Sequence, residues 1–356
     1  MSSPAKPLES NAALRNGKLE KPSLLTTSKV LVTTFLIAVV FLGSWRYWSL
    51  TVETPLVENA DEIVVMQVMP GGHFHGVMSD LQWLGLTRPS WLWRVYGRLN
   101  ASRVHVGEYR LFAESSLETF VESMVLGREW LHSITFVEGW TLARLRSELF
   151  ANPRIISISH NWTEQQLMEA LGCAGCFAEG SFLPETYFYR RGDTDLELLE
   201  RAYQGMQNEL AMVWDRRQSG LPLATPEELL ILASMIEKET SLESERGHVS
   251  GVFIRRLAMG MRLQTDPTVI YGLGDDYDGS LTRQDLRTDH PWNTYTRNGL
   301  PQTPIALPGQ ASLRAAAHPL EGDALYFVSK GDGSHVFSAT LEEHNRAVRK
   351  YIRGRE

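Results

Sequence analysis

The pattern of apolar and polar positions begins with one long uncharged run near the start of the chain. Residues 30–45 are sixteen consecutive side chains without a charge, between Lys29 and Arg46. The run is shorter than the ~20 residues of a usual membrane span, but an arginine that reaches the interface and aromatic residues at positions 45, 47 and 48 extend it. These features predict a retained membrane helix over residues 30–48. A cleaved signal peptide is the alternative, although no small-residue cleavage site follows the run.

The segment after this helix changes between strand and helix periodicity. Residues 62–69 alternate as in a strand, and the apolar residues from Val77 to Leu84 repeat with helical spacing. Further helices are expected at residues 91–99 and 116–125, with a short strand at residues 107–111 between them. This run of about 65 residues is small enough to form a separate module.

The rest of the chain predicts a larger domain of helices and strands. Residues 178–189 lack a clear period and are rich in aromatic and acidic side chains, which suits either the lining of a cleft or an ordinary buried loop. Residues 292–295 and 299–301 form either a sugar-binding loop or a structural turn. The other expected elements are strands at 132–137 and 260–265, a hairpin of 324–328 with 335–337, and helices beginning at 141 or covering 163–171, 197–214, 249–257, 266–271 and 341–352.

One helix has a clear start signal and an acidic residue on its apolar face. Thr225 is suited to cap the helix, Pro226 to its first position, and Glu228 to the third. At ~100° per residue, Glu239 points from the middle of the apolar face, whereas Glu237 turns to another side. Burial and the helix C-terminus both raise a carboxyl pKa, so Glu239 is suited to donate a proton at neutral pH. The alternative is a structural ion pair with one of the arginines at positions 246, 255, 256 and 262.

Composition and charge narrow the class of protein. The 356 residues are 43% hydrophobic and 22% charged, which excludes a collagen-like or wholly disordered chain. The net charge of −7 lacks the basic surplus that nucleic-acid binding requires, so no nucleic-acid partner is expected. Residues 1–29 nevertheless carry five basic and two acidic side chains. Because basic flanks stay in the cytoplasm, residues 49–356 are expected across the membrane, in the periplasm of a bacterium.

The cysteines and histidines give no clear metal or redox motif. Cys173 and Cys176 follow a helical run, whereas a redox pair opens a helix after a strand. A local disulfide or two free thiols is therefore expected. His73 and His75 lie in a glycine-rich turn without a nearby cysteine or carboxylate, which favours a structural role.

Several long motifs occur in one order over the last 130 or so residues. They are ASMIEKET at 233–240, GMRLQTDPTVIYG at 260–272, NTY at 293–295, GLP at 299–301, AAAHP at 315–319, YFV at 326–328 and HN at 344–345. In these motifs the chain resembles the endolytic murein transglycosylase (YceG-like) family. The segments VEG at 137–139, EG at 179–180 and PET at 184–186 extend the resemblance more weakly. Glu185 stands where the family pattern has Asp, and the cysteine pair is not part of that pattern.

The resemblance implies an α+β protein of the bacterial inner membrane. Its expected parts are a cytoplasmic tail at 1–29, one transmembrane helix at 30–48, a small LysM-like module at 49–130 and a lytic transglycosylase domain at 131–356. The family's catalytic glutamate corresponds to Glu239. The expected substrate-binding residues are Gln264, Thr265, Asp266, Tyr271, Asn293, Tyr295 and Glu185. No metal or cofactor is expected.

The implied reaction is non-hydrolytic cleavage of the β-1,4 bond between N-acetylmuramic acid and N-acetylglucosamine within nascent peptidoglycan strands. It leaves 1,6-anhydro ends and terminates strand growth, with penicillin-binding peptidoglycan synthases as expected partners. One rival is a muramidase, which needs a second catalytic carboxylate from Glu179, Glu185 or Asp266. The other rival is a peptidoglycan-binding scaffold without activity. A carboxyl on an apolar face argues against a scaffold, because burial of that group costs free energy.

Overall fold

The computed structural model describes residues 24–49, 63–87, 92–101, 103–112 and 115–352. The chain divides into two compact units, Met1–Glu129 and Trp130–Glu356. Most of the tail expected at residues 1–29 therefore lies outside the described residues.

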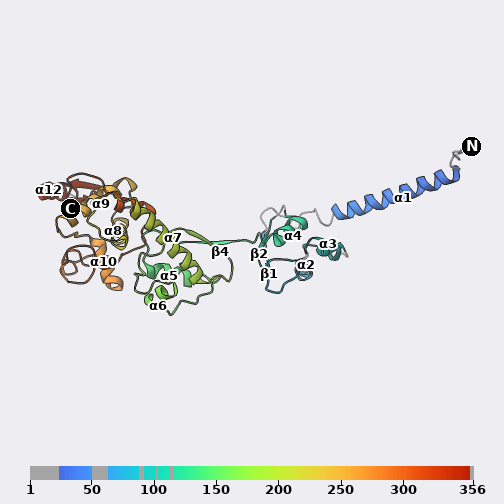
Figure 1. Ribbon diagram of the computed structural model, residues 1–356, viewed down its shortest axis with the longest axis horizontal. Helices are drawn as coiled ribbons and strands as arrows, with labels where there is room; N and C mark the ends of the chain where they lie inside the picture. Colours follow the sequence, from blue (N-terminus) through green and yellow to red (C-terminus); the bar gives the residue numbers. More distant parts are fainter. Residues whose placement is uncertain (1–23, 50–62, 88–91, 102, 113–114, 353–356) are drawn as a thin grey trace, which may run out of the picture. The chain divides into compact units, whose positions relative to one another are not determined.

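The described part of the chain has one long apolar helix, near the N-terminus. Helix α1 covers Leu24–Trp48, and its stretch Ser28–Trp48 is long and apolar enough to cross a membrane (Figure 1). Its residues from Ser28 to Tyr47 are exposed, and only Trp48 at its end is partly buried. An exposed helix surface of apolar side chains is stable in the apolar interior of a membrane. The length and composition of this helix therefore suit a membrane anchor or a signal sequence.

The rest of the first unit is a small mixed α/β module. Strand β1, Val64–Val68, pairs antiparallel with β2, Gly107–Leu111, with Met66 opposite Tyr109. Helices α2, Phe74–Trp83, and α3, Leu92–Asn100, lie between these strands in the sequence, and α4, Leu117–Val125, follows them. The apolar core that joins these elements includes Val68, Leu81, Leu111, Phe120 and Met124. The elements agree with those expected from the periodicity of this segment.

The second unit opens with two strands that are far apart in the sequence. Strand β3, His132–Thr135, pairs antiparallel with β4, Thr186–Tyr189. Helices α5, Leu142–Phe150, and α6, Glu164–Ala170, lie between them in the sequence, and the long helix α7, Asp195–Asp215, follows. One apolar core, which includes Phe136, Leu145, Leu167, Phe182 and Leu199, holds this half together.

The remaining half of the second unit is built around helix α8, Pro226–Glu239. Thr225 accepts a hydrogen bond from the backbone N–H of Glu228, and Pro226 opens the helix, as the sequence predicts. All residues from Leu229 to Ile236 are buried, because α8 is packed by α7, α9, α10 and α11. Those neighbours are α9, Glu243–Ala258, α10, Asp266–Leu273, and α11, Gln310–Ala317, with a short 3-10 helix at Gly274–Asp276 after α10.

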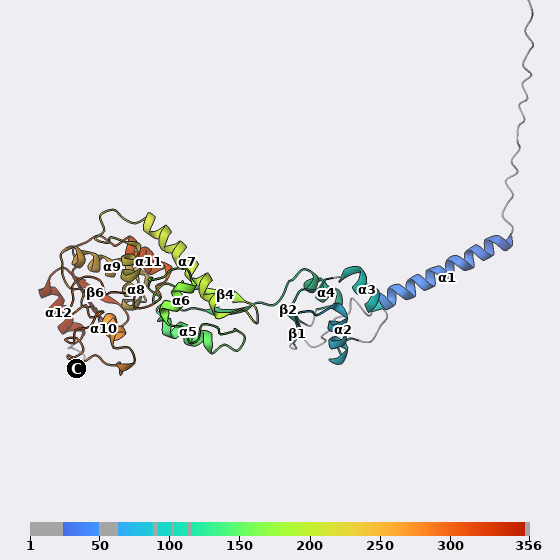
Figure 2. The same ribbon diagram turned by 60° about the horizontal axis from the view of Figure 1, so that its bottom comes forward.

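A hairpin and a helix complete the unit. Strand β5, Tyr326–Ser329, pairs antiparallel with β6, His335–Ser338, and α12, Leu341–Tyr351, packs on both strands. Figure 2 shows α12 beside β6, at the end of this unit where α10 also lies.

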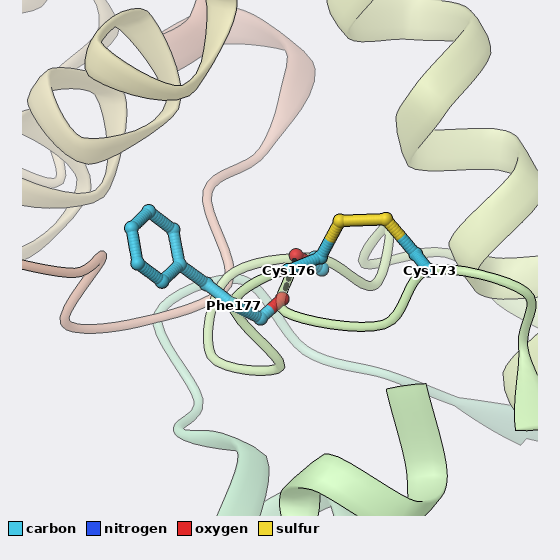
Figure 3. Close-up of a disulfide and its surroundings, with 4 residues drawn as sticks. Cys173, Cys176 and Phe177 are labelled. Carbon is cyan, nitrogen blue, oxygen red and sulfur yellow. Dashed lines mark hydrogen bonds between the residues drawn. A yellow bond between two sulfur atoms is a disulfide. The ribbon is translucent and has the colours of Figure 1, made fainter. Parts of the chain in front are cut away.

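Two expectations for this unit are wrong in their secondary structure. Residues 260–265 form no strand but an irregular connection between α9 and α10. Residues 178–189, which the sequence leaves without a period, include strand β4, with Tyr187 and Tyr189 turned into the core. Of the two alternatives for the cysteine pair, a local disulfide or two free thiols, the structure has the disulfide between Cys173 and Cys176, just before Phe177 (Figure 3).

Candidate active site

A cleft of about 430 Å³ opens at the C-terminal end of α8. Its walls come from α8, the connection before α10, the NTY motif, the β5–β6 hairpin and α12. This volume lies within the range of small-molecule sites. The lining residues are Glu239, Arg256, Leu263, Gln264, Thr265, Asp266, Tyr295, Tyr326, Phe327, Val328, Ser329, His335, Leu341, His344 and Val348.

Glu239 is the last residue of α8 and presents its carboxyl group to this cleft. The hydroxyl of Thr265 donates a hydrogen bond of 2.5 Å to Oε2 of Glu239. Burial raises the pKa of Glu239, while the Thr265 hydrogen bond and the charges of His335 and Arg256 oppose that rise. The net effect favours a protonated carboxyl, which is the form that can act as a general acid.

The connection that carries Thr265 is fixed by the NTY motif. The backbone N–H of Gln264 donates to the carbonyl of Thr294 at 3.2 Å, and the N–H of Thr265 donates to Oγ1 of Thr294 at 3.1 Å. Gln264 has a φ of +51° and is the one non-glycine residue with a positive φ in the described chain. Such a conformation is uncommon for a side chain other than Gly, Asn or Asp and is often found at functional sites. Two motifs distant in sequence therefore form one rigid wall.

The same wall holds a second pair of polar side chains. The hydroxyl of Tyr295 donates a 2.5 Å hydrogen bond to Oδ1 of Asp266, and both residues line the cleft. Burial and this hydrogen bond raise the pKa of Tyr295, so the tyrosine keeps its proton. Asp266 is exposed, and its carboxylate is oriented by the tyrosine.

Arg256, in the last turn of α9, links the connection before α10 to the segment before β5. Its Nε donates to the carbonyl of Leu325 at 2.6 Å and its Nη1 donates to the carbonyl of Leu263 at 2.7 Å. The guanidinium also lies over the ring of Tyr326, 5.2 Å from its centroid. Arg256 thus joins α9 to both walls of the cleft while adding a positive charge to the lining.

Glu237, two residues before Glu239, contacts a different part of the fold. Its Oε2 accepts hydrogen bonds from the backbone N–H of Gly309 at 3.0 Å and the hydroxyl of Ser312 at 2.7 Å. Its Oε1 lies 3.6 Å from Arg246, with 7% of the Glu237 side chain and 11% of the Arg246 side chain exposed. The structural ion pair considered for Glu239 is therefore formed by Glu237, which does not line the cleft.

The cleft includes four of the seven expected substrate-binding residues, Gln264, Thr265, Asp266 and Tyr295. Tyr271 instead donates a hydrogen bond of 3.1 Å to Glu179. Asn293 is fully buried, and its amide donates to backbone carbonyls of the preceding loop, including that of Thr288 at 2.7 Å. Glu185 is exposed beside β4, outside the lining of the cleft. Of the two alternatives for residues 178–189, the lining of a cleft or an ordinary buried loop, the first does not hold for this cleft, since none of these residues is in its lining.

Glu179, a candidate for a second carboxylate, is also outside the lining. It is buried and accepts hydrogen bonds from the backbone N–H of Leu142, at the start of α5, and from the hydroxyl of Tyr271. Burial raises its pKa to about 7, although these hydrogen bonds oppose the rise. Glu179 thus links α5 to α10. Among the described residues, Asp266 is the one candidate second carboxylate that lines the cleft with Glu239.

The sequence did not assign five polar residues of the lining to the site, Arg256, Tyr326, Ser329, His335 and His344. Tyr326 and His344 belong to the YFV and HN motifs, and Arg256 was considered only as an ion-pair partner. His344 stacks on Tyr326 at 5.3 Å, and burial lowers its pKa, which favours the neutral ring. For Tyr326 and His344, membership of the YFV and HN motifs was the sequence signal that could have assigned them to the site.

The site is that of a protein with one carboxyl of raised pKa in a polar, aromatic-lined cleft on an α+β domain. The model of the YceG-like family matches residues 66–350, and the chain therefore belongs to this family. The match begins within strand β1 and includes every residue that lines the cleft.

Individual relatives agree with this assignment. The chain is 40% identical over 174 residues to the endolytic murein transglycosylase of Bacillus subtilis (strain 168), which covers 49% of this chain. It is 24% identical over 362 residues to that of Streptococcus pneumoniae (strain ATCC BAA-255 / R6), which covers 91% of this chain. The chain spans 48% and 65% of the lengths of these relatives. The crystal structure of a yceG-like protein from Listeria monocytogenes superposes with a TM-score of 0.53 and 26% identity, over 80% of this chain and 98% of the other.

Proposed function

We propose that this chain is a membrane-anchored endolytic lytic transglycosylase that cleaves the β-1,4 bond between N-acetylmuramic acid and N-acetylglucosamine in peptidoglycan. The observation that carries the proposal is Glu239, a carboxyl whose pKa is raised by burial and which faces a polar cleft. The names of the two relatives support the same activity.

One carboxyl group is sufficient for this reaction. Glu239 gives its proton to the glycosidic oxygen as the bond to C1 breaks. The C6 hydroxyl of the same muramic acid attacks C1 and passes its proton to the Glu239 carboxylate, which restores the acid. The nucleophile is intramolecular, so no water needs activation and the product has a 1,6-anhydro end. Gln264, Thr265, Asp266 and Tyr295 are the proposed contacts to the sugars.

The proposed setting is the inner membrane, with the second unit in the periplasm. The apolar helix α1 and the basic residues that precede it support this orientation. We propose that the first-unit module is LysM-like and binds glycan, because its order of elements, β-α-α-β-α, suits that role. The anchor would keep the cleft beside nascent strands and the penicillin-binding synthases, where cleavage terminates strand growth. Protease added to spheroplasts then digests the large unit, whereas digestion only after permeabilisation contradicts this topology.

Product analysis tests the activity. The full chain in detergent is incubated with purified, unlabelled glycan strands, and the products are analysed by mass spectrometry. A transglycosylase gives 1,6-anhydromuramic acid ends from the interior of strands. Reducing ends would instead indicate a muramidase, for which Asp266 is the candidate second carboxylate in the cleft. Binding without any cleavage would indicate a scaffold.

A further inference from the structure

One histidine in the lining of the same cleft is held by a carboxylate that lies outside the lining. His335 begins β6 and lines the cleft, and Glu245 lies in the first turn of α9. Nδ1 of His335 is 2.7 Å from Oε2 of Glu245, and the backbone N–H of His335 donates to Oε1 at 2.9 Å. The side chains are only 11% and 13% exposed. One carboxylate therefore fixes both the backbone and the ring of His335.

This pairing determines which ring atom can serve a ligand. An ionised Glu245 only accepts hydrogen bonds, so Nδ1 of His335 carries a hydrogen. Nε2 is then the polar ring atom left for the cleft, and it has no hydrogen-bond partner within the described part of the chain. Nε2 can pair with a hydroxyl group in either charge state of the ring, as an acceptor in the neutral ring and as a donor in the charged ring.

Aromatic packing also restricts the ring. Phe327 meets the imidazole edge to face, with centroids 5.5 Å apart and an interplanar angle of 87°. Phe337, on the same strand, lies 6.4 Å away. A side chain held both by a carboxylate and by packing is preorganised, as binding and catalytic groups are. His335 and Glu239 line the same cleft, so the ring and the acid face the same ligand.

We propose that His335 contacts the substrate directly, through a hydrogen bond between Nε2 and a sugar hydroxyl of the glycan in the cleft. Glu245 is the positioning residue that holds the ring. This inference rests on the proposed function, since that function makes glycan the ligand of the cleft. The rival explanation is purely structural: the pair would only tie α9 to β6.

Two substitutions separate these explanations, because each keeps a different half of the imidazole. In His335→Asn, the amide nitrogen lies near the position of Nδ1 and can still donate to Glu245, but no atom replaces Nε2. In His335→Gln, the longer amide reaches the region of Nε2 and loses the contact with Glu245. The matched control is His248→Gln, since His248 is exposed and stacks on Phe337 at 5.1 Å without lining the cleft.

Binding is measured in full-length protein that carries Glu239→Gln, so that a fluorescently labelled glycan strand is not cut. We expect His335→Asn to bind about 10-fold more weakly than its parent, as suits the loss of one hydrogen bond, and more weakly than His335→Gln. Melting temperatures should rank in the opposite order, with His335→Gln the less stable. The control should match its parent in both measurements. If binding instead follows stability, with His335→Asn equal to its parent, the contact is refuted.

The results also distinguish failure of the His335 contact from failure of the proposed activity. If the wild type produces anhydro ends but the ranking fails, only the His335 contact is wrong. If the parent binds glycan and the ranking holds while the wild type cuts nothing, the contact stands and the proposed activity is wrong. If the parent binds no glycan, the contact is also overturned.

Discussion

The hydroxyl of Thr265 donates a 2.5 Å hydrogen bond to Oε2 of Glu239, and the backbone N–H of Thr265 donates to Oγ1 of Thr294. Thr294 of the NTY motif thus holds Thr265 in place, and the hydroxyl of Thr265 in turn affects the pKa of Glu239. Burial raises the pKa of Glu239, and the Thr265 hydrogen bond limits that rise because it stabilises the carboxylate. A substitution at Thr265 should separate the effect of burial on this pKa from the effect of the hydrogen bond.

Thr265→Val removes the donor while keeping the shape of the side chain. The pKa of Glu239 should then rise further. Because the acid must be protonated to act, activity declines as the pH rises through this pKa, so the alkaline limb of the pH profile of kcat/KM should move to higher pH. Thr265→Ser keeps a hydroxyl and should retain the wild-type limb. A limb that moves to lower pH in the valine variant would show that Thr265 does not act on the acid in this way.

Glu237→Gln should affect stability rather than chemistry. The substitution leaves Arg246 without its carboxylate partner in a buried site, which should lower the free energy of unfolding by roughly 2–3 kcal/mol. Chemical denaturation measures this loss, with the exposed neighbour Lys238→Gln as a control that should change little. Cleavage per folded molecule should stay within a few-fold of wild type. An unchanged stability would mean that the Glu237–Arg246 pair contributes nothing.

Glu179 should make stability depend on pH. Its pKa is raised by burial from an ordinary 4.5 to about 7, so the folded state binds the proton more tightly than the unfolded state. This contribution is complete below about pH 4.5 and is lost as the pH rises through about 7, a change of about 3 kcal/mol. Urea unfolding over this range should show a steeper decline for the wild type than for Glu179→Gln.

Glu185→Gln is the control for that experiment, because Glu185 is close in sequence and exposed. Its unfolding free energy should follow the wild-type dependence on pH. Parallel curves for Glu179→Gln and wild type would contradict the assignment of the slope to Glu179.

The sequence predicted those elements that carry local signals. Thr225 and Pro226 mark the start of α8, and alternation marks β1 and β2, so both were found. Helix α11 was missed because Gly309 caps it without a side-chain hydrogen bond and its residues show no strong polar start signal. Strand β4 was missed because its partner β3 lies about fifty residues earlier, and pairing at that distance leaves no local trace.

The motifs located the site, but they could not distinguish residues that line the cleft from residues that are buried beside it. Asn293 and Tyr295 belong to one three-residue motif, yet the asparagine is buried among backbone carbonyls and the tyrosine lines the cleft. The helical wheel assigned Glu237 and Glu239 to different sides, but α8 is buried along most of its length, so Glu237 also meets protein. His335 joins the cleft from a distant hairpin. Only the three-dimensional packing distinguishes these cases.

The central claim is that Glu239 is the acid, and the yield of 1,6-anhydro ends from Glu239→Gln tests it most directly. Gln keeps the shape of the side chain but cannot transfer a proton, so the yield should fall by at least ~100-fold, with an unchanged melting temperature and retained glycan binding. Glu237→Gln, corrected for its folded fraction, serves as the matched comparison and should still produce anhydro ends. The account is contradicted if Glu239→Gln remains active while the folded Glu237→Gln protein is inactive.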